Sequence, residues 1–101
     1  MNMSFIISQA EKTDILEVLI KYRDTALLER DEHKKEKDYY DKLMDLMINH
    51  NEEYPMDWGE IFNRLQTNYH EHREKYEELC STIASLDLNI EILLCYTEMI
   101  D

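Results

Sequence analysis

Residues 50–60 read HNEEYPMDWGE, and this stretch holds the only proline, the only glycine and the only tryptophan of the 101-residue chain. Pro55 lacks a backbone donor and disfavours the helical conformation at Tyr54, so a helix that reaches this point must end. Asp57 is a helix-capping residue, and Glu60 follows three positions later, as in a capping box. The stretch therefore predicts a turn over residues 51–57 between two helices.

The segment after the turn carries one unbroken helical pattern. Its mostly apolar and aromatic residues recur in alternating steps of three and four, which is the seam of a heptad repeat. We expect a helix from about 58 to about 98. The seam consists of Phe62, Leu65, Tyr69, His72, Tyr76, Leu79, Ile83, Leu86, Ile90 and Leu93.

The segment before the turn carries a weaker version of this pattern. Ser8 and Glu11 have capping-box spacing, which predicts a helix from about 9 to about 50. A short break near Thr13 is an alternative, and residues 1–7 are either an extra turn or an extended arm. The expected seam consists of Ile15, Leu19, Tyr22, Ala26, Glu29, His33, Glu36, Tyr40, Leu43 and Met47.

Two helices of similar length joined by a short turn fold back antiparallel. The expected fold is one all-α domain over residues 1–101, a coiled-coil-like two-helix hairpin that assembles into a dimeric four-helix bundle. The register predicts that Glu36 pairs with His72. Residues 29–38 have no apolar side chain. We interpret them as an exposed helix face with pairs such as Asp31–Lys35, and a helix break there is the alternative.

The ends of the hairpin opposite the turn are apolar on more than one helix face. A lone hairpin leaves such a patch exposed and buries little surface, so we expect a homodimer. A heteromeric partner helix and the folding of residues 1–7 over the patch are the alternatives. The expected interface consists of Ile15, Leu16, Leu19, Ile20, Ile83, Leu86, Ile90, Leu93 and Leu94.

The net charge of −12, from 23 acidic and 11 basic residues, disfavours direct binding to nucleic acid or to an acidic membrane. It favours a protein partner with a basic surface. Two segments, 43–63 and 76–101, contain acids but no Lys or Arg. They define an acidic tip, made of Glu52, Glu53, Tyr54, Met56, Asp57, Trp58 and Glu60. They also define a C-terminal acidic face, made of Glu77, Glu78, Asp87, Glu91 and Glu98.

No catalytic constellation is visible, so we expect no enzyme activity, no cofactor and no metal. The chain lacks a glycine-rich phosphate loop and Cys–His zinc spacing. His70 and Glu74 share a helix face and are the remaining candidates for a weak metal site. Cys80 and Cys95 lie about 22 Å apart along one helix, which is too far for a disulfide within one chain. Free thiols in a reducing cytoplasm are expected, and an intermolecular disulfide is the alternative. We expect neither a signal peptide nor a membrane span.

In length and layout, a helical hairpin with tryptophan at its turn, the chain resembles the small Trp-x-Gly proteins exported by type VII secretion. It departs from their motif, because Trp58 and Gly59 are adjacent and Ile100 stands where an acid should follow Tyr96. In acidity and size it is similar to small phage and mobile-element inhibitors, including DNA mimics and anti-CRISPR proteins. These features imply binding that inhibits or regulates a basic-surfaced partner. The alternative is a structural or adaptor hairpin, such as a secretion partner, a chaperone or a coiled-coil subunit.

Overall fold

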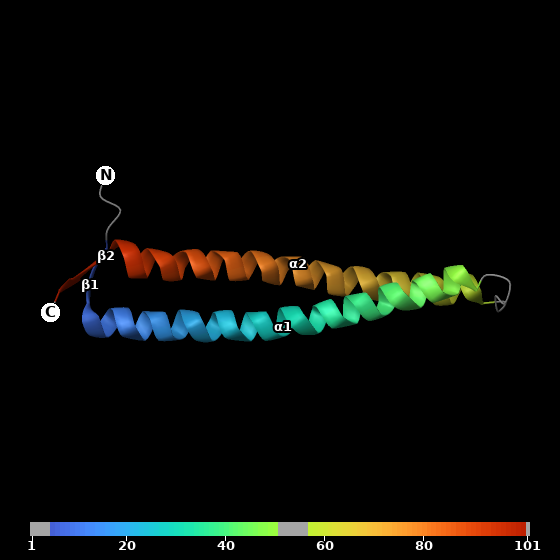
Figure 1. Cartoon of the computed structure of the whole chain (residues 1–101), viewed down its shortest axis with the longest axis horizontal. Coiled ribbons are helices and arrows are strands. Elements are labelled where there is room, and N and C mark those ends of the chain that lie inside the picture. Colours follow the sequence, from blue (N-terminus) through green and yellow to red (C-terminus); the bar gives the residue numbers. More distant parts are fainter. Residues whose placement is uncertain (1–4, 51–56, 101) are drawn as a thin grey trace. The chain divides into compact units, whose positions relative to one another are not determined.

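The computed structural model describes the backbone of residues 5–50 and 57–100, with the side chains of 7–50 and 57–95. Two long helices, α1 (Gln9–Asn49) and α2 (Trp58–Tyr96), pack against each other as an antiparallel hairpin (Figure 1). Two short strands, β1 (Phe5–Ser8) and β2 (Thr97–Ile100), flank them in the sequence. The expected helical hairpin is therefore confirmed, with a small sheet added to it.

Contacts divide the chain into two compact units. Unit 1 comprises Met1–Leu28 and Leu79–Asp101, and unit 2 comprises Glu29–Glu78, so each unit contains part of both helices. In unit 1 the buried apolar side chains are Ala26, Ile83 and Ile90, and in unit 2 the buried one is Met44. Among the described residues no large side chain is fully buried, so both cores are thin.

The start of α1 forms as the Ser8–Glu11 spacing predicts. The Glu11 backbone N–H donates to Ser8 Oγ at 3.1 Å, and the Ser8 hydroxyl donates to Glu11 Oε1 at 3.2 Å. These bonds satisfy a donor that the first helical turn leaves unpaired. The helix then runs without a break through Thr13 and through residues 29–38, so both alternatives with a break are wrong.

The start of α2 lies at Trp58, as expected, but its cap differs. The Ile61 N–H donates to the backbone carbonyl of Asp57 at 3.0 Å. Within the described residues the Asp57 carboxylate makes no capping hydrogen bond. The capping box expected from Asp57 and Glu60 is therefore absent from that part of the chain.

The two strands pair in parallel, with Phe5 opposite Thr97 and Ser8 opposite Ile100. The expectation that α2 continues to about residue 98 is thus wrong by two residues. An extended conformation is correct for 5–7, which is one of the two alternatives for that segment. The backbone N–H and C=O groups of each strand find hydrogen-bond partners in the other strand, whereas those of a frayed helical turn would have none.

The seam of α2 is confirmed, because all ten of its expected members are buried or half-buried. The seam of α1 is partly wrong. Leu19, Ala26, His33, Tyr40, Leu43 and Met47 are buried or half-buried as expected, but the other four positions lie one residue later, and buried Met44 adjoins Leu43. The observed seam has Leu16, Arg23, Arg30, Lys37 and Met44, whereas the expected Ile15, Tyr22, Glu29 and Glu36 are exposed. Long Arg and Lys stems lie along an apolar seam while their charged ends reach water.

Two expected pairs are also wrong. Glu36 is exposed and makes no ion pair with His72, because His33 occupies that place and lies against His72. Asp31 is 3.4 Å from Arg30 and makes no pair with Lys35. The first error follows from the one-residue shift of the α1 seam, whereas the second arises within α1, where Arg30 is the partner of Asp31.

Candidate functional site

The described part of the acidic tip consists of Asp57, Trp58 and Glu60 at the start of α2. The other predicted tip residues, Glu52, Glu53, Tyr54 and Met56, lie outside the described residues. Trp58 is half-buried, and its ring stacks on Phe62 with a centroid distance of 4.9 Å and an interplanar angle of 9°. Trp58 thus packs within unit 2, whereas Asp57 and Glu60 are exposed.

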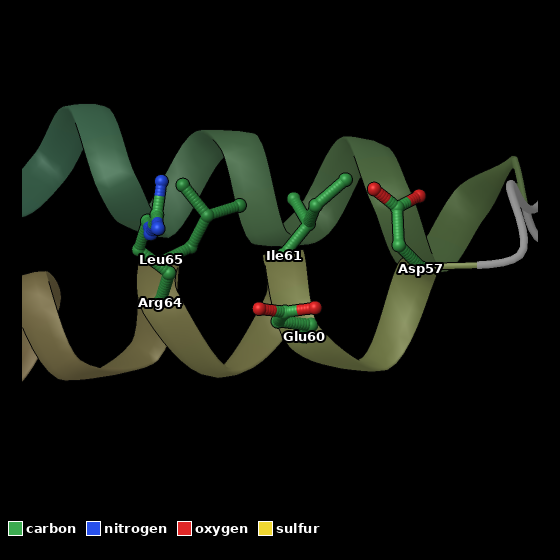
Figure 2. A pocket seen from close by; sticks show the side chains of 5 residues that line it. All are labelled: Asp57, Glu60, Ile61, Arg64 and Leu65. Atoms are coloured by element: carbon green, nitrogen blue, oxygen red, sulfur yellow. The ribbon is translucent and has the colours of Figure 1, made fainter.

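A hollow of about 220 Å³ opens beside the first turns of α2, entirely within unit 2. Figure 2 shows its lining, with Asp57 and Arg64 at opposite ends of the view and Glu60 and Ile61 between them. Leu65 completes the lining. Neither acid forms an ion pair within the described residues, nor does Arg64. The hollow thus combines two carboxylates with an apolar surface.

Asp45 belongs with these acids, although sequence analysis did not assign it to a site. It lies in the last turns of α1, is exposed, and has no ion pair within the described part of the chain. The sequence did offer a signal for Asp45, because this residue lies in segment 43–63, which contains acids but no Lys or Arg. Together, Asp45, Asp57 and Glu60 form the described acidic end of unit 2.

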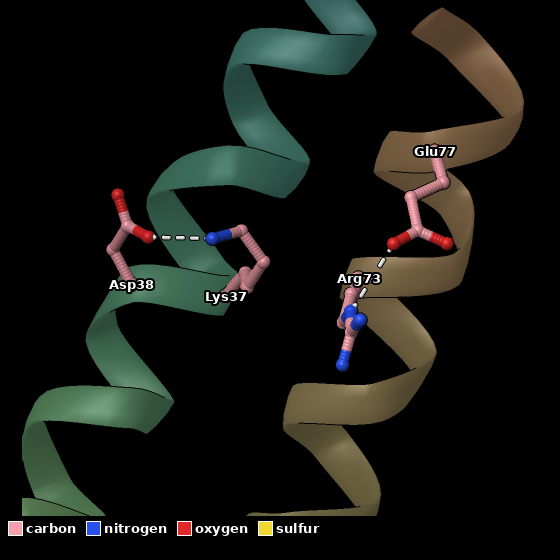
Figure 3. Close-up of polar contacts among 4 residues, drawn as sticks. All are labelled: Lys37, Asp38, Arg73 and Glu77. Atoms are coloured by element: carbon pink, nitrogen blue, oxygen red, sulfur yellow. Dashed lines mark hydrogen bonds and ion pairs between the residues drawn. The ribbon is translucent and has the colours of Figure 1, made fainter. Parts of the chain in front are cut away.

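The predicted C-terminal acidic face is largely occupied by the chain's own cations. In unit 2, Glu77 accepts from Arg73 at 3.2 Å (Figure 3), and Glu78 lies 3.7 Å from Lys75. In unit 1, Asp87 lies 3.5 Å from Arg23. Glu91 is exposed without an ion pair to any described residue, and the side chain of Glu98 is outside the described set. Three of the five acids therefore already have a cationic partner.

The residues of the expected dimer interface divide into two groups. Ile83 and Ile90 are buried within unit 1, so they form the core of the hairpin itself. Leu16, Leu19, Leu86 and Leu93 are half-buried, whereas Ile15, Ile20 and Leu94 are exposed. The expected interface left out further exposed apolar side chains of unit 1, namely Val18, Tyr22, Leu28 and Leu88. The one-residue shift of the α1 seam explains why Tyr22 was placed inside.

A polar layer crosses the middle of unit 2. The Nδ1 atoms of His33 and His72 are 2.9 Å apart, and the ring of Tyr40 stacks on His72 at 5.8 Å and 13°. Lys37 lies 5.8 Å from the centre of the Tyr76 ring. The hydrogen bond from Lys37 Nζ to Asp38, 2.9 Å long (Figure 3), raises the pKa of this lysine above its ordinary value, and desolvation opposes the rise. Unit 2 is therefore held together partly by polar contacts.

No described residues cluster as a metal site, since no group of three His, Cys, Asp or Glu side chains converges in that part of the chain. His70 and Glu74 are both exposed. Cys80 is half-buried, Cys95 is exposed, and both are free thiols. Neither α1 nor α2 combines the length and apolar character that crossing a membrane requires.

Comparisons with known proteins found no match for this chain among family models, curated proteins or solved structures.

Proposed function

We propose that this protein acts without catalysis, by binding a partner protein with a basic surface through the acidic end of unit 2, and that the binding inhibits or regulates the partner. The observation that carries the proposal is the pairing of the acids. Asp45, Asp57 and Glu60 are exposed and lack an ion pair within the described residues, whereas Glu77, Glu78 and Asp87 each lie beside a Lys or Arg. Unpaired carboxylates attract a cationic partner more strongly than neutralised ones.

The hollow beside α2 suits a lysine or arginine side chain of that partner. Ile61 and Leu65 offer apolar surface to the aliphatic stem, and Asp57 and Glu60 offer carboxylates to the charged end. Arg64 lies at the far end of the hollow from Asp57, so a cation is favoured on the Asp57 side. More specifically, the partner's basic surface normally binds nucleic acid. The carboxylates of this chain occupy that surface in place of the nucleic acid.

Matched charge reversals test the proposal. The partner is isolated by affinity capture from the source cell and identified by mass spectrometry, and its affinity is then measured. We expect Asp45→Lys, Asp57→Lys and Glu60→Lys together to weaken binding more than tenfold, or by about 1.4 kcal/mol. The control carries Glu77→Lys, Glu78→Lys and Asp87→Lys, which changes the net charge equally. Binding that survives the first set and is lost in the second would contradict the proposal.

Salt and competition refine the test. Affinity for a basic surface falls steeply as ionic strength rises. If the partner's site binds nucleic acid, an oligonucleotide should compete with this protein for it. A partner whose binding is unaffected by salt would instead support the second candidate function.

That second candidate is an adaptor or assembly subunit that acts through apolar surface. Unit 1 leaves several large apolar side chains exposed, and such patches usually mark an interface. Ile15, Val18 and Tyr22 are among them, with exposed fractions of 40%, 51% and 64%. Light scattering should then give about twice 12.3 kDa, with little dependence on salt.

A further inference from the structure

The contact between His33 and His72 sets a condition on their protons. A neutral imidazole has one nitrogen that donates and one that accepts, whereas a protonated imidazole only donates. At 2.9 Å the two Nδ1 atoms are within hydrogen-bond distance, so one must donate and the other must accept. The bond therefore exists only while at least one of the two rings is neutral.

The surroundings of the pair oppose a second proton. Both rings are half-buried, with centroids 5.1 Å apart, and Tyr40 covers one face of His72. The half-buried charged side chains of unit 2 are cations, Arg30 and Lys37 on α1, and every carboxylate among its described residues is exposed. From α2 the half-buried titratable neighbours are Tyr69 and Tyr76. The exposed ones within about one turn of the pair are Glu29, Asp31, Glu32, Lys34, Lys35 and Glu36 on α1 and His70, Glu71, Arg73, Glu74 and Lys75 on α2.

We propose that the His33–His72 pair is a pH-sensitive switch, which holds α1 and α2 together in unit 2 at neutral pH and releases them in mild acid. The folded pair retains its bond with no more than one added proton. In the unfolded chain the two histidines are independent, and each takes up its own proton near pH 6.5. The unfolded state therefore binds more protons in acid, and stability must fall as the pH falls.

A fall in pH should stabilise the rest of the folded chain. A loss of stability on acidification is therefore diagnostic of the histidine pair. At a net charge of −12 the folded chain repels itself, and added protons relieve that repulsion. Ordinary carboxylates titrate near pH 4, so they contribute little between pH 7.5 and 5.5. A loss of stability in this interval consequently points to histidine and not to the acids.

Unfolding of the full chain by urea at pH 7.5 and 5.5, followed by circular dichroism, tests the switch. We expect the folding equilibrium constant to fall by about five- to tenfold at pH 5.5. Hydrogen exchange at pH 5.5, corrected for the intrinsic rate, should accelerate at residues 29–40 and 69–78 more than in unit 1. His33→Gln keeps a polar partner for His72 but does not titrate, so it should abolish the fall. His70→Gln is the matched control, because it removes an exposed histidine of unit 2 that lies two residues from His72 on α2, and it should leave the fall intact.

Stability that stays level or rises on acidification would overturn the proposal, as would an equal fall in His33→Gln and the native chain. If His33→Gln does not fold, NMR titration of the four histidines in the native chain decides. The switch requires the His33 and His72 signals to change together and to be linked to loss of unit 2 structure. Independent protonation of all four histidines without structural change would refute it.

Discussion

Units 1 and 2 contain segments of the same two helices, yet their helices pack by different means. In unit 1 the contact is made by Ala26, Ile83 and Ile90, which are 7–8% exposed. Among the described residues of unit 2, Met44 is the one buried apolar side chain, and the middle is a polar layer around His33 and His72. The same heptad spacing, with inward positions three and four residues apart, thus supports either apolar or polar packing of the two helices. Apolar burial responds weakly to pH and salt, whereas a histidine pair responds strongly to pH.

Removing apolar packing from unit 1 should have the largest effect. Ile90→Ala deletes most of a side chain that is 8% exposed, and we expect a loss of about 2–4 kcal/mol in the free energy of unfolding. Urea titration at pH 7.5 measures it. The control is Leu88→Ala on the same helix, where the side chain is 57% exposed and the change should stay within about 0.5 kcal/mol. Equal losses would mean that Leu88 is covered, as in a dimer.

Met44→Ala tests the apolar contribution to unit 2 and the shifted seam of α1 together. Met44 is 8% exposed and Leu46 is 45% exposed. We expect a loss of about 2 kcal/mol from Met44→Ala, at the low end for such changes because unit 2 is also held by polar contacts. Leu46→Ala should change stability by less than about 0.5 kcal/mol. The reverse order in thermal unfolding would show that the seam does not pass through Met44.

The smallest contrast compares the two helix starts. The Ser8 hydroxyl in unit 1 accepts a hydrogen bond from the Glu11 N–H, whereas the Asp57 carboxylate in unit 2 accepts none from the described residues. We expect Ser8→Ala to reduce the free energy of unfolding by about 1 kcal/mol and Asp57→Ala by a few tenths at most. Differential scanning calorimetry on both variants measures the contrast. A larger loss from Asp57→Ala would reveal a side-chain cap that involves residues 51–56.

The sequence predicted the hairpin because its strongest signals are local. Ten α2 positions follow the heptad seam, and Ser8 with Glu11 marks a helix start that the structure forms. The α1 seam was harder to predict because apolar residues are sparse there. Tyr22 looked like an inward residue and Arg23 like an outward one, but the Arg23 stem fits the seam and its guanidinium reaches Asp87. Strands β1 and β2 were missed because each is four residues long and pairs with a segment at the other end of the sequence.

The candidate site was predictable to a similar extent. The concentration of acids on residues 43–63 follows from counting, so the sequence alone was enough to propose Asp57 and Glu60 as site residues. The neutralisation of Glu77 by Arg73 was also available from their four-residue spacing on one helix. The neutralisation of Asp87 by Arg23 was not, because it needs the correct register between the helices. The His33–His72 contact was missed for the same reason.

The antiparallel course of the helices also fixes the order in which the chain closes on itself. The His33–His72 contact joins residues 39 positions apart, and the Arg23–Asp87 contact joins residues 64 positions apart. Closing the longer loop from an open chain costs about 0.4 kcal/mol more in conformational entropy, and β1 and β2 span a still longer one. Folding that begins near the turn therefore forms the contacts of unit 2 first, and the pairing of β1 with β2 completes it. The segment with fewer buried apolar side chains is thus the one whose contacts close the shorter loops.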